Sequence, residues 1–226
     1  MNAEEKSGKK IVVLFSGGLD SSTMLAQAVQ EREEGVEIIA ISFLYGQKHK
    51  KELESAKAIS KHYEVEHKMM QLPQLEGSSL TSEEEIESKT EKEALPATFV
   101  PGRNILFLTL GAAQGYMRSK REEKLEIWIG ATAADQEGYP DCRIAFMEKM
   151  EEALKDGLDR PLLKVKSPLV KLTKKEIVLE AVKLGVPLEL TWTCYEGGEK
   201  PCGECDSCIF REEGFREAGV KDPLKE

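Results

Sequence analysis

The chain has 226 residues, 32% of them charged, and a formal net charge of −9 at pH 7. This length suits one α/β domain with a small appendage. The acidic balance disfavours a protein that grips a nucleic-acid backbone, and no apolar run reaches membrane-spanning length. With a polar start and no apolar signal region, the sequence predicts a cytoplasmic protein that binds neither nucleic acid nor membranes.

The first predicted strand and the turn after it carry the strongest local signal. Ile11–Phe15 is a β-branched apolar run, typical of a buried parallel strand, and Ser16–Gly18 breaks it. We expect Asp20, Ser21 or Ser22 to cap the helix that follows. Backbone N–H groups and hydroxyls at a helix N-terminus form a phosphate site, although an ordinary glycine-rich turn is the alternative.

The sequence of this turn, Ser-Gly-Gly-x-Asp-Ser, fits neither the Walker A pattern nor Gly-x-Gly-x-x-Gly. It resembles the pyrophosphate loop (PP-loop) of ATP pyrophosphatases, which cleave ATP to AMP and pyrophosphate while adenylating a substrate. The resemblance implies catalytic roles for Ser16, Asp20 and Ser21, and Mg²⁺ bound with ATP. Asp20 would ligate that Mg²⁺ or simply cap the helix. The implied ATP-binding residues are Leu14, Phe15, Ser16, Gly17, Gly18, Leu19, Asp20, Ser21, Ser22 and Thr23.

Apolar strands and amphipathic helices alternate along the chain, which is typical of a parallel sheet with right-handed crossovers. The sequence therefore predicts an α/β fold, a Rossmann-like parallel sheet with helices on both faces. The expected strands are Ile11–Phe15, Glu37–Phe43, Val65–Met70, Leu125–Ile129 and Lys164–Ser167. The expected helices end near Arg32, Tyr63, Met117, Lys155 and Gly185, the last opening with a capping box at Thr173–Glu176.

Ligands of such sheets bind beyond the carboxyl ends of the strands, where Ser16–Ser21 and Phe43–His49 are expected to meet. Residues 76–94 contain seven Glu and two Lys, a net charge of −5, and are expected to form a mobile loop or a lid over substrate.

Two later segments carry polar groups next to apolar elements. Thr98–Asn104 leads into a nearly all-apolar helix, which we expect to be buried all round. Arg103, at its start, forms a surface ion pair or faces an anion. After the fourth strand, the loop Gly130–Arg143 carries carboxylates, an aromatic, a thiol and an arginine, a composition suited to chemistry.

Four of the five cysteines lie close together, with the spacing C-x7-C-x2-C-x2-C. Four thiolates suit a closed tetrahedral zinc site. An iron–sulfur cluster is the rival, but its usual run continues to a further Cys-Pro, which is missing here. Redox-active or sulfur-carrying thiols are the third alternative. The fifth cysteine, Cys142, is interpreted as a buried inert thiol. The expected metal ligands are Cys194, Cys202, Cys205 and Cys208.

Together with the first loop, the segments TFVPGRN (98–104), GYPDCR (138–143) and the cysteine run resemble the 7-cyano-7-deazaguanine synthase family, over residues 11–210. These enzymes make the queuosine and archaeosine precursor. Residues 134–137 depart from the family's Leu-Asp-Tyr-Ser, which leaves any role of Gln136 or Glu137 open. The resemblance implies an adenine nucleotide alpha hydrolase-like PP-loop domain over residues 1–190 and a zinc-binding segment over residues 191–226.

The implied enzyme is a ligase that forms C–N bonds. Its substrate, 7-carboxy-7-deazaguanine, would be adenylated by ATP, aminated by ammonia, and adenylated again to yield the nitrile, with release of AMP and pyrophosphate. Arg103 and Arg143 would hold the substrate carboxylate, Asp141 the guanine-like edge, and Tyr139 would stack on the ring. The implied substrate residues are Arg103, Asn104, Tyr139, Asp141 and Arg143, the last also catalytic. Without a recognisable glutaminase, ammonia is expected from solution. The family also implies a homodimer.

Three rival functions stay open from the sequence. A tRNA-thiolating PP-loop enzyme would need reactive thiols and a basic surface, for which only a lysine cluster at residues 164–175 is available, and solvated lysines are its plain interpretation. A zinc-ribbon binding module on a degenerate nucleotide fold would lack catalysis. A third enzyme would deliver the adenylated acid to a protein amine.

Overall fold

The computed structural model describes residues 8–46, 51–75, 78, 80–81, 95–196 and 198–225. The predicted loop or lid at residues 76–94 falls almost wholly outside the described residues, as do residues 47–49 of the expected ligand edge. Of the helices in the described ranges, none is both long enough and apolar enough to cross a bilayer.

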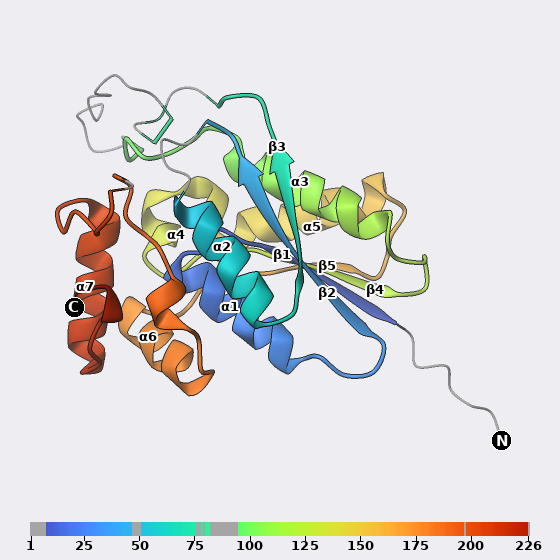
Figure 1. Ribbon diagram of the computed structural model, residues 1–226. Helices are drawn as coiled ribbons and strands as arrows, with labels where there is room; N and C mark the ends of the chain where they lie inside the picture. The colour runs from blue at the N-terminus through green and yellow to red at the C-terminus, as the bar shows by residue number, and fades with distance from the viewer. Residues whose placement is uncertain are drawn as a thin grey trace.

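Five parallel strands form a single sheet in the order β3-β2-β1-β4-β5 (Figure 1). The central strand β1 pairs on both sides, with Val13 opposite Ala40 of β2 and Trp128 of β4. The change of strand order at β1 places a ligand crevice at its carboxyl end. The strands are β1 (Lys9–Leu14), β2 (Val36–Leu44), β3 (Glu66–Gln71), β4 (Lys124–Trp128) and β5 (Leu163–Lys166), so the predicted sheet is confirmed.

Helices cover both faces of the sheet, and α6 and α7 continue the layer that holds α1 (Figure 1). The capping box expected at the start of α6 is present, with Thr173 and Glu176 bonded to each other's backbone N–H groups. The helices are α1 (Leu19–Gln30), α2 (Lys51–His62), α3 (Arg103–Tyr116), α4 (Asp135–Gly138), α5 (Ile144–Gly157), α6 (Lys174–Lys183) and α7 (Asp206–Ala218). Short 3₁₀ turns are η1 (Pro140–Cys142), η2 (Leu188–Leu190) and η3 (Pro223–Lys225).

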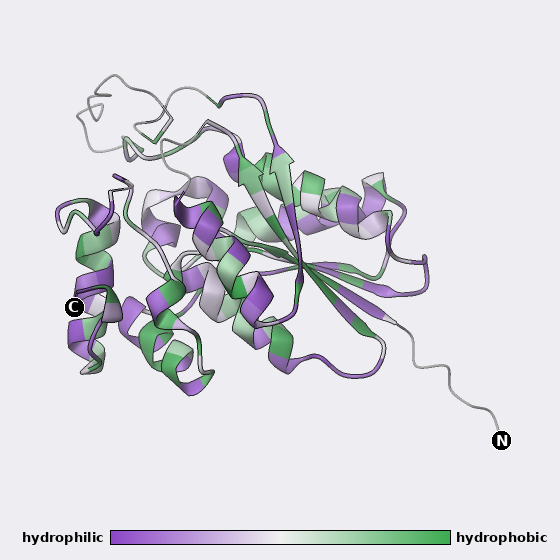
Figure 2. Ribbon diagram, in the orientation of Figure 1, coloured by the Kyte–Doolittle hydropathy of each residue, from purple (hydrophilic) through white to green (hydrophobic). Residues whose placement is uncertain are grey.

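The alternation of side chains along β1 divides the core into two clusters. Ile11 and Val13 pack with α1, α2 and α6, whereas Val12 and Leu14 pack with α3 and α5. The apolar residues concentrate on the strands and the inner helix faces (Figure 2). Gly115 lets α3 approach closely, because a Cβ there would lie 3.0 Å from Val12 Cγ2.

Two local expectations are wrong. The helix α3 is not buried all round: Ile105 and Leu106 are 46% and 40% exposed, because only one face of the helix meets β1 and β4. The N-cap of α1 is Gly18, with no side-chain cap, so Asp20, Ser21 and Ser22 lie inside the helix. Ser21 Oγ is bonded to Ser16 Oγ, and the Asp20 carboxylate is bonded to Lys174, whereas Ser22 Oγ is buried without a hydrogen-bond partner among the described residues.

Candidate active site and metal centre

The PP-loop sits where β1 ends and α1 begins. Gly17 has φ +87°, and a Cβ at this position would lie 2.5 Å from the backbone nitrogen of Ala56 and would also collide with the carbonyl oxygen of Glu52. The loop is therefore held tightly against α2. Ser16 Oγ accepts from Gly18 N at 3.2 Å and bonds Ser21 Oγ at 3.0 Å, which fixes both hydroxyls before any ligand arrives.

Asp20 points away from the cap position and into an ion pair. Lys174 Nζ, from the first turn of α6, donates to both carboxylate oxygens at 2.7 Å, and both side chains are half-buried. The interpretation of the lysine cluster as simply solvated is wrong for Lys174. Lys164 and Lys166 also form ion pairs, with Glu151 and Glu126, each at 2.9 Å.

A cavity of about 310 Å³ opens over the loop, at the carboxyl ends of the central strands. Seven of the ten expected ATP-binding residues line it, whereas Gly17, Ser22 and Thr23 lie behind the surface. The cavity thus brings together the PP-loop, β2, α2, α3 and the cysteine segment. The lining residues outside the loop include Ser42, Phe43, Tyr45, Glu52, Leu53, Arg103, Asn104, Phe107, Gly130, Thr193, Cys194, Tyr195 and Ser207.

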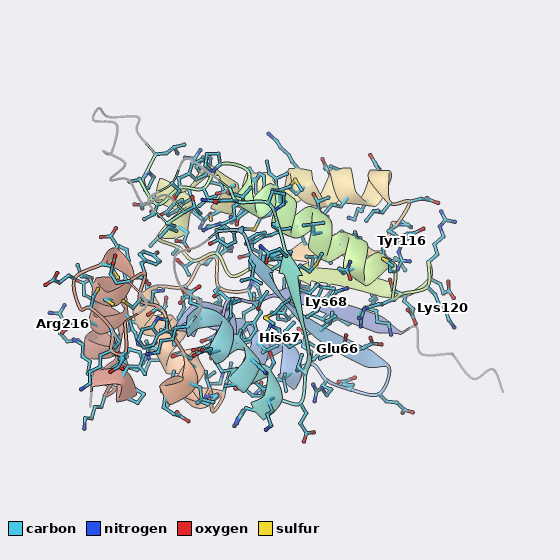
Figure 3. All side chains as sticks on the ribbon, turned by 45° about the horizontal axis from the view of Figure 1, so that its top comes forward. Glu66, His67, Lys68, Tyr116, Lys120 and Arg216 are labelled. Atoms are coloured by element: carbon cyan, nitrogen blue, oxygen red, sulfur yellow. The ribbon has the colours of Figure 1, made fainter. Side chains whose placement is uncertain are left out.

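Ser42 of β2, which lines this cavity, is held in place by His67 of the edge strand β3. Figure 3 labels His67 between Glu66 and Lys68. Ser42 Oγ donates to Phe15 O at 2.6 Å, so it accepts from His67 Nε2 at 2.7 Å. Burial holds the pKa of His67 below its usual value, which favours the neutral ring. This relay joins the ends of β1 and β2 beside the PP-loop.

A second hollow of about 150 Å³ adjoins the cavity and shares Arg103, Asn104 and Tyr195 with it. Tyr139 lines this hollow, and its hydroxyl is hydrogen-bonded to Thr98 Oγ1 at 2.6 Å. The structure therefore joins the two segments TFVPGRN and GYPDCR, which are distant in sequence, beside the PP-loop cavity.

Arg103 is the cation between the two hollows. Burial lowers its pKa, but Tyr45, which is hydrogen-bonded to it, and Asp141 outweigh burial, so the pKa lies above its usual value and the guanidinium stays charged. Burial raises the pKa of Asp141, and the positive charge of Arg103 reduces that rise. A permanent positive charge thus faces the space next to the PP-loop.

Other expected substrate residues are not brought to this space. Arg143 is exposed, its Nε donates to Gln136 O at 3.3 Å, and it lines neither hollow. Asp141 is buried, and its backbone oxygen accepts from Asn104 Nδ2 at 3.2 Å. Asn104 therefore supports the loop as well as lining the cavity. Gln136, whose role the sequence left open, donates to Val170 O at 2.8 Å and so braces the loop.

The fifth cysteine, Cys142, is buried, as the sequence predicts. It contacts Asn104 Nδ2 at 3.4 Å and has its pKa raised to about 12 by burial and the nearby Asp135 and Asp141. A thiol with so high a pKa is not a nucleophile at neutral pH.

The four remaining cysteines converge as expected, with all their sulfur atoms within 4.8 Å of one another. Backbone N–H groups point at the sulfurs: Cys202 N and Glu196 N reach Cys194 Sγ at 3.3 and 3.4 Å. Cys205 N and Glu204 N donate to Cys202 Sγ, and these bonds lower the pKa of Cys202 to about 7. Four convergent sulfurs, two of them receiving N–H bonds that favour thiolates, fit a metal centre.

The metal segment is also a wall of the cavity. Trp192 N donates to Gly17 O at 3.0 Å, and Lys51 Nζ lies 3.9 Å from the centre of the Trp192 ring while donating to Gly198 O at 2.9 Å. The buried ion pair between Arg211 and Asp222 connects α7 to the residue just before η3. The cysteine segment and the PP-loop are thus one packed unit.

Glu52 is the site residue that the sequence did not reveal. It lines the cavity from the first turn of α2. Burial raises its pKa to about 7, with Arg103 partly offsetting the effect. In the sequence it is one acid among many in an amphipathic helix, a position typical of the surface.

The comparisons with known proteins agree with this site. The family model described as queuosine biosynthesis protein QueC matches residues 10–219. A 7-cyano-7-deazaguanine synthase of Thermoplasma volcanium is 49% identical, covering 96% of this chain and 90% of that protein. A protein of the same name from Oceanobacillus iheyensis is 44% identical, covering 97% of this chain and 99% of that protein. The names of these relatives support a role in queuosine precursor synthesis and confirm the prediction of a ligase-type enzyme.

Among solved structures, the U34-tRNA thiolase NcsA of Methanococcus maripaludis, solved with its 4Fe–4S cluster, superposes with a TM-score of 0.52. It is 19% identical and is matched over 96% of this chain and 66% of its own length, so the likeness shows a shared α/β fold alone. The homodimer, the cytoplasmic location and the division at residue 190 stay predictions. The sequence relatives and the family model show that the chain belongs to the QueC family of queuosine biosynthesis proteins.

Proposed function

We propose that this chain converts 7-carboxy-7-deazaguanine, ammonia and ATP into 7-cyano-7-deazaguanine through an acyl-adenylate and an amide. The observation that carries the proposal is the position of Arg103, which lines both the PP-loop cavity and the hollow with Tyr139. ATP in the first space and the deazapurine in the second would bring the substrate carboxylate to the α-phosphate.

The PP-loop would stabilise the leaving pyrophosphate. Ser16 and Ser21 present hydroxyls that their mutual bond holds in place, and the first residues of α1 line the same cavity. Donors fixed in advance lose little orientational freedom when charge develops on the leaving group. Asp20, the carboxylate of this loop, is the residue that would hold Mg²⁺, an ion that takes oxygen ligands and neutralises phosphate charge.

The deazapurine acid would be oriented by the second hollow. Arg103 has the fork geometry that binds a carboxylate through two hydrogen bonds, and it keeps its charge in the buried site. Tyr139 offers a flat aromatic face, and Thr98 fixes the orientation of its hydroxyl. We assign the carboxylate to Arg103 rather than to the exposed Arg143.

We also propose that the four cysteines hold one Zn²⁺ per chain, with a structural role. Four sulfur donors suit a closed tetrahedral zinc site, and a closed site leaves no position for substrate. Zinc there would fix the wall formed by Cys194 and Tyr195.

The exchange of labelled pyrophosphate into ATP tests the first chemical step. Adenylation of the acid is reversible, so exchange should depend on 7-carboxy-7-deazaguanine and need no ammonia. Guanine, which lacks the carboxylate, is the matched negative control. Exchange that is independent of the acid, or release of ADP and phosphate alone, would contradict the proposal.

A further inference from the structure

We infer that the Glu52 carboxylate accepts the protons that nitrogen loses in this reaction, which makes it a further catalytic residue of the cavity. The inference rests on the proposed function, because it concerns the steps that follow adenylation.

The position of Glu52 is set by close packing. Its backbone carbonyl lies against Gly17, in the space that any Cβ there would occupy. Glu52 lines the cavity together with residues from three other elements: Tyr45 after β2, Arg103 of α3 and Tyr195 of the cysteine segment. Glu52 thus shares one cavity with the loop proposed to hold ATP phosphates and with the arginine proposed to hold the acid.

Three carboxylates line the two hollows, and two of them are engaged. Asp20 accepts two hydrogen bonds from Lys174, and Asp135 accepts from the backbone nitrogen and the hydroxyl of Thr132, both at 2.8 Å. Among the described residues, Glu52 has no hydrogen-bond donor assigned to its carboxylate, and its charged neighbour is Arg103. When the substrate carboxylate engages Arg103, Glu52 is the acid left to receive a proton.

The reaction requires such an acceptor at nitrogen. Attack of ammonia on the acyl-adenylate forms the C–N bond, AMP leaves with the electron pair of the C–O bond, and one proton must leave nitrogen. In the second round, the amide oxygen bonds to the α-phosphorus and pyrophosphate leaves with its electron pair. AMP then leaves the carbon while nitrogen loses two protons, and the nitrile forms. Each proton passes to Glu52 and from it to solvent.

The protonation equilibrium of Glu52 suits this task. Burial raises its pKa to about 7, so near neutral pH the group can both take and release protons. A carboxylate in an exposed position, with a pKa several units lower, would be a much weaker base toward a nitrogen cation.

The test compares Glu52→Gln, which keeps the shape of the side chain, with Glu54→Gln, its exposed neighbour on α2. Two rates are measured in each protein: acid-dependent pyrophosphate exchange, and ammonia-dependent formation of amide and nitrile. We expect exchange in Glu52→Gln to stay within about threefold of wild type, while ammonia-dependent product falls on the order of a hundredfold. Retained exchange also shows that the variant is folded. Glu54→Gln should match wild type in both assays.

Two further measurements separate a base from a structural role. Hydroxylamine is largely unprotonated at neutral pH, and its adduct loses its proton more readily, so hydroxamate formation should fall much less than amide formation. Glu52→Asp keeps a carboxylate and should recover part of the ammonia-dependent rate even if the glutamine variant folds poorly.

Equal losses of exchange and amide formation in Glu52→Gln, or a wild-type rate of amide formation, would overturn the inference. A wild-type enzyme without acid-dependent exchange would overturn the proposed function itself, which makes the two failures distinguishable.

Discussion

Lys174 donates to both carboxylate oxygens of Asp20 at 2.7 Å, although 154 positions separate the two residues. The pair connects the first turn of α6 with the PP-loop at the edge of the cavity. Because each side chain is about one quarter exposed, at 27%, the pair contributes modestly to stability, and its more important effect is to orient Asp20.

Replacing Asp20 should separate function from stability. We expect Asp20→Ala to lower turnover on the order of a hundredfold or more, because the loop loses its one acidic group. Its free energy of unfolding should fall by only about 1 kcal/mol, as for other partly exposed ion pairs. Steady-state rates and denaturant titrations measure the two effects. Glu37→Ala, which removes another surface pair with Lys10, should leave turnover unchanged.

Arg103 should determine binding of the deazapurine acid. Arg103→Lys keeps the charge and loses the fork, so KM for the acid should rise about tenfold or more, the equivalent of about 1.5–3 kcal/mol. KM for ATP should change little. Arg143→Lys is the matched control, since the exposed Arg143 lines neither hollow. A loss that falls on ATP instead would assign Arg103 to a phosphate.

Removal of the metal should open the cavity wall. Elemental analysis should give one zinc per chain, and chelation or Cys202→Ser should lower the melting temperature and weaken ATP binding, because Cys194 lines the cavity and Trp192 is bonded to the PP-loop. Hydrogen exchange should rise first in residues 192–208. A brown protein with iron–sulfur absorption bands and no zinc would contradict the zinc assignment.

Glu52 should also make stability depend on pH. Its pKa is about 7 in the folded protein against 4.5 for an exposed glutamate, so the folded state holds a proton that the unfolded state releases. This contribution to stability is present below pH 4.5 and is lost as the pH rises through 7. Glu52→Gln should therefore be more stable than wild type at pH 8, by about 1–3 kcal/mol, and equal to it near pH 4. Denaturant unfolding at the two pH values checks this, and a stability gain of the same size at both would contradict it.

The sequence could predict the elements whose signals are local. β-branched runs such as Ile11–Leu14 specify buried strands, and the spacing of the four cysteines specifies their convergence. Pairings across the fold could not be predicted, because nothing near Asp20 indicates Lys174 and nothing near Glu52 indicates Arg103. The position of Arg143 has a local cause: it lies in extended backbone just before α5, and its Nε donates to Gln136 O.

The burial of the helix α3 could also be predicted only in part. Its apolar composition indicates burial but does not say which face the sheet covers, and Ile105 and Leu106 are left on the outside. Gly18, rather than a neighbouring serine or aspartate, is the N-cap of α1, and Ser21 Oγ is bonded to Ser16 Oγ and to Gly18 O.

Mass spectrometry of a complete reaction tests the central claim most directly. The protein is incubated with ATP, ¹⁵N-labelled ammonium and 7-carboxy-7-deazaguanine, and the products are quantified together. The account predicts a nitrile that carries the label, with two AMP and two pyrophosphate molecules released for each nitrile formed. Labelled amide should appear transiently before it. No AMP release that depends on the acid, or an acid recovered on a protein amine with no labelled product, would contradict the account.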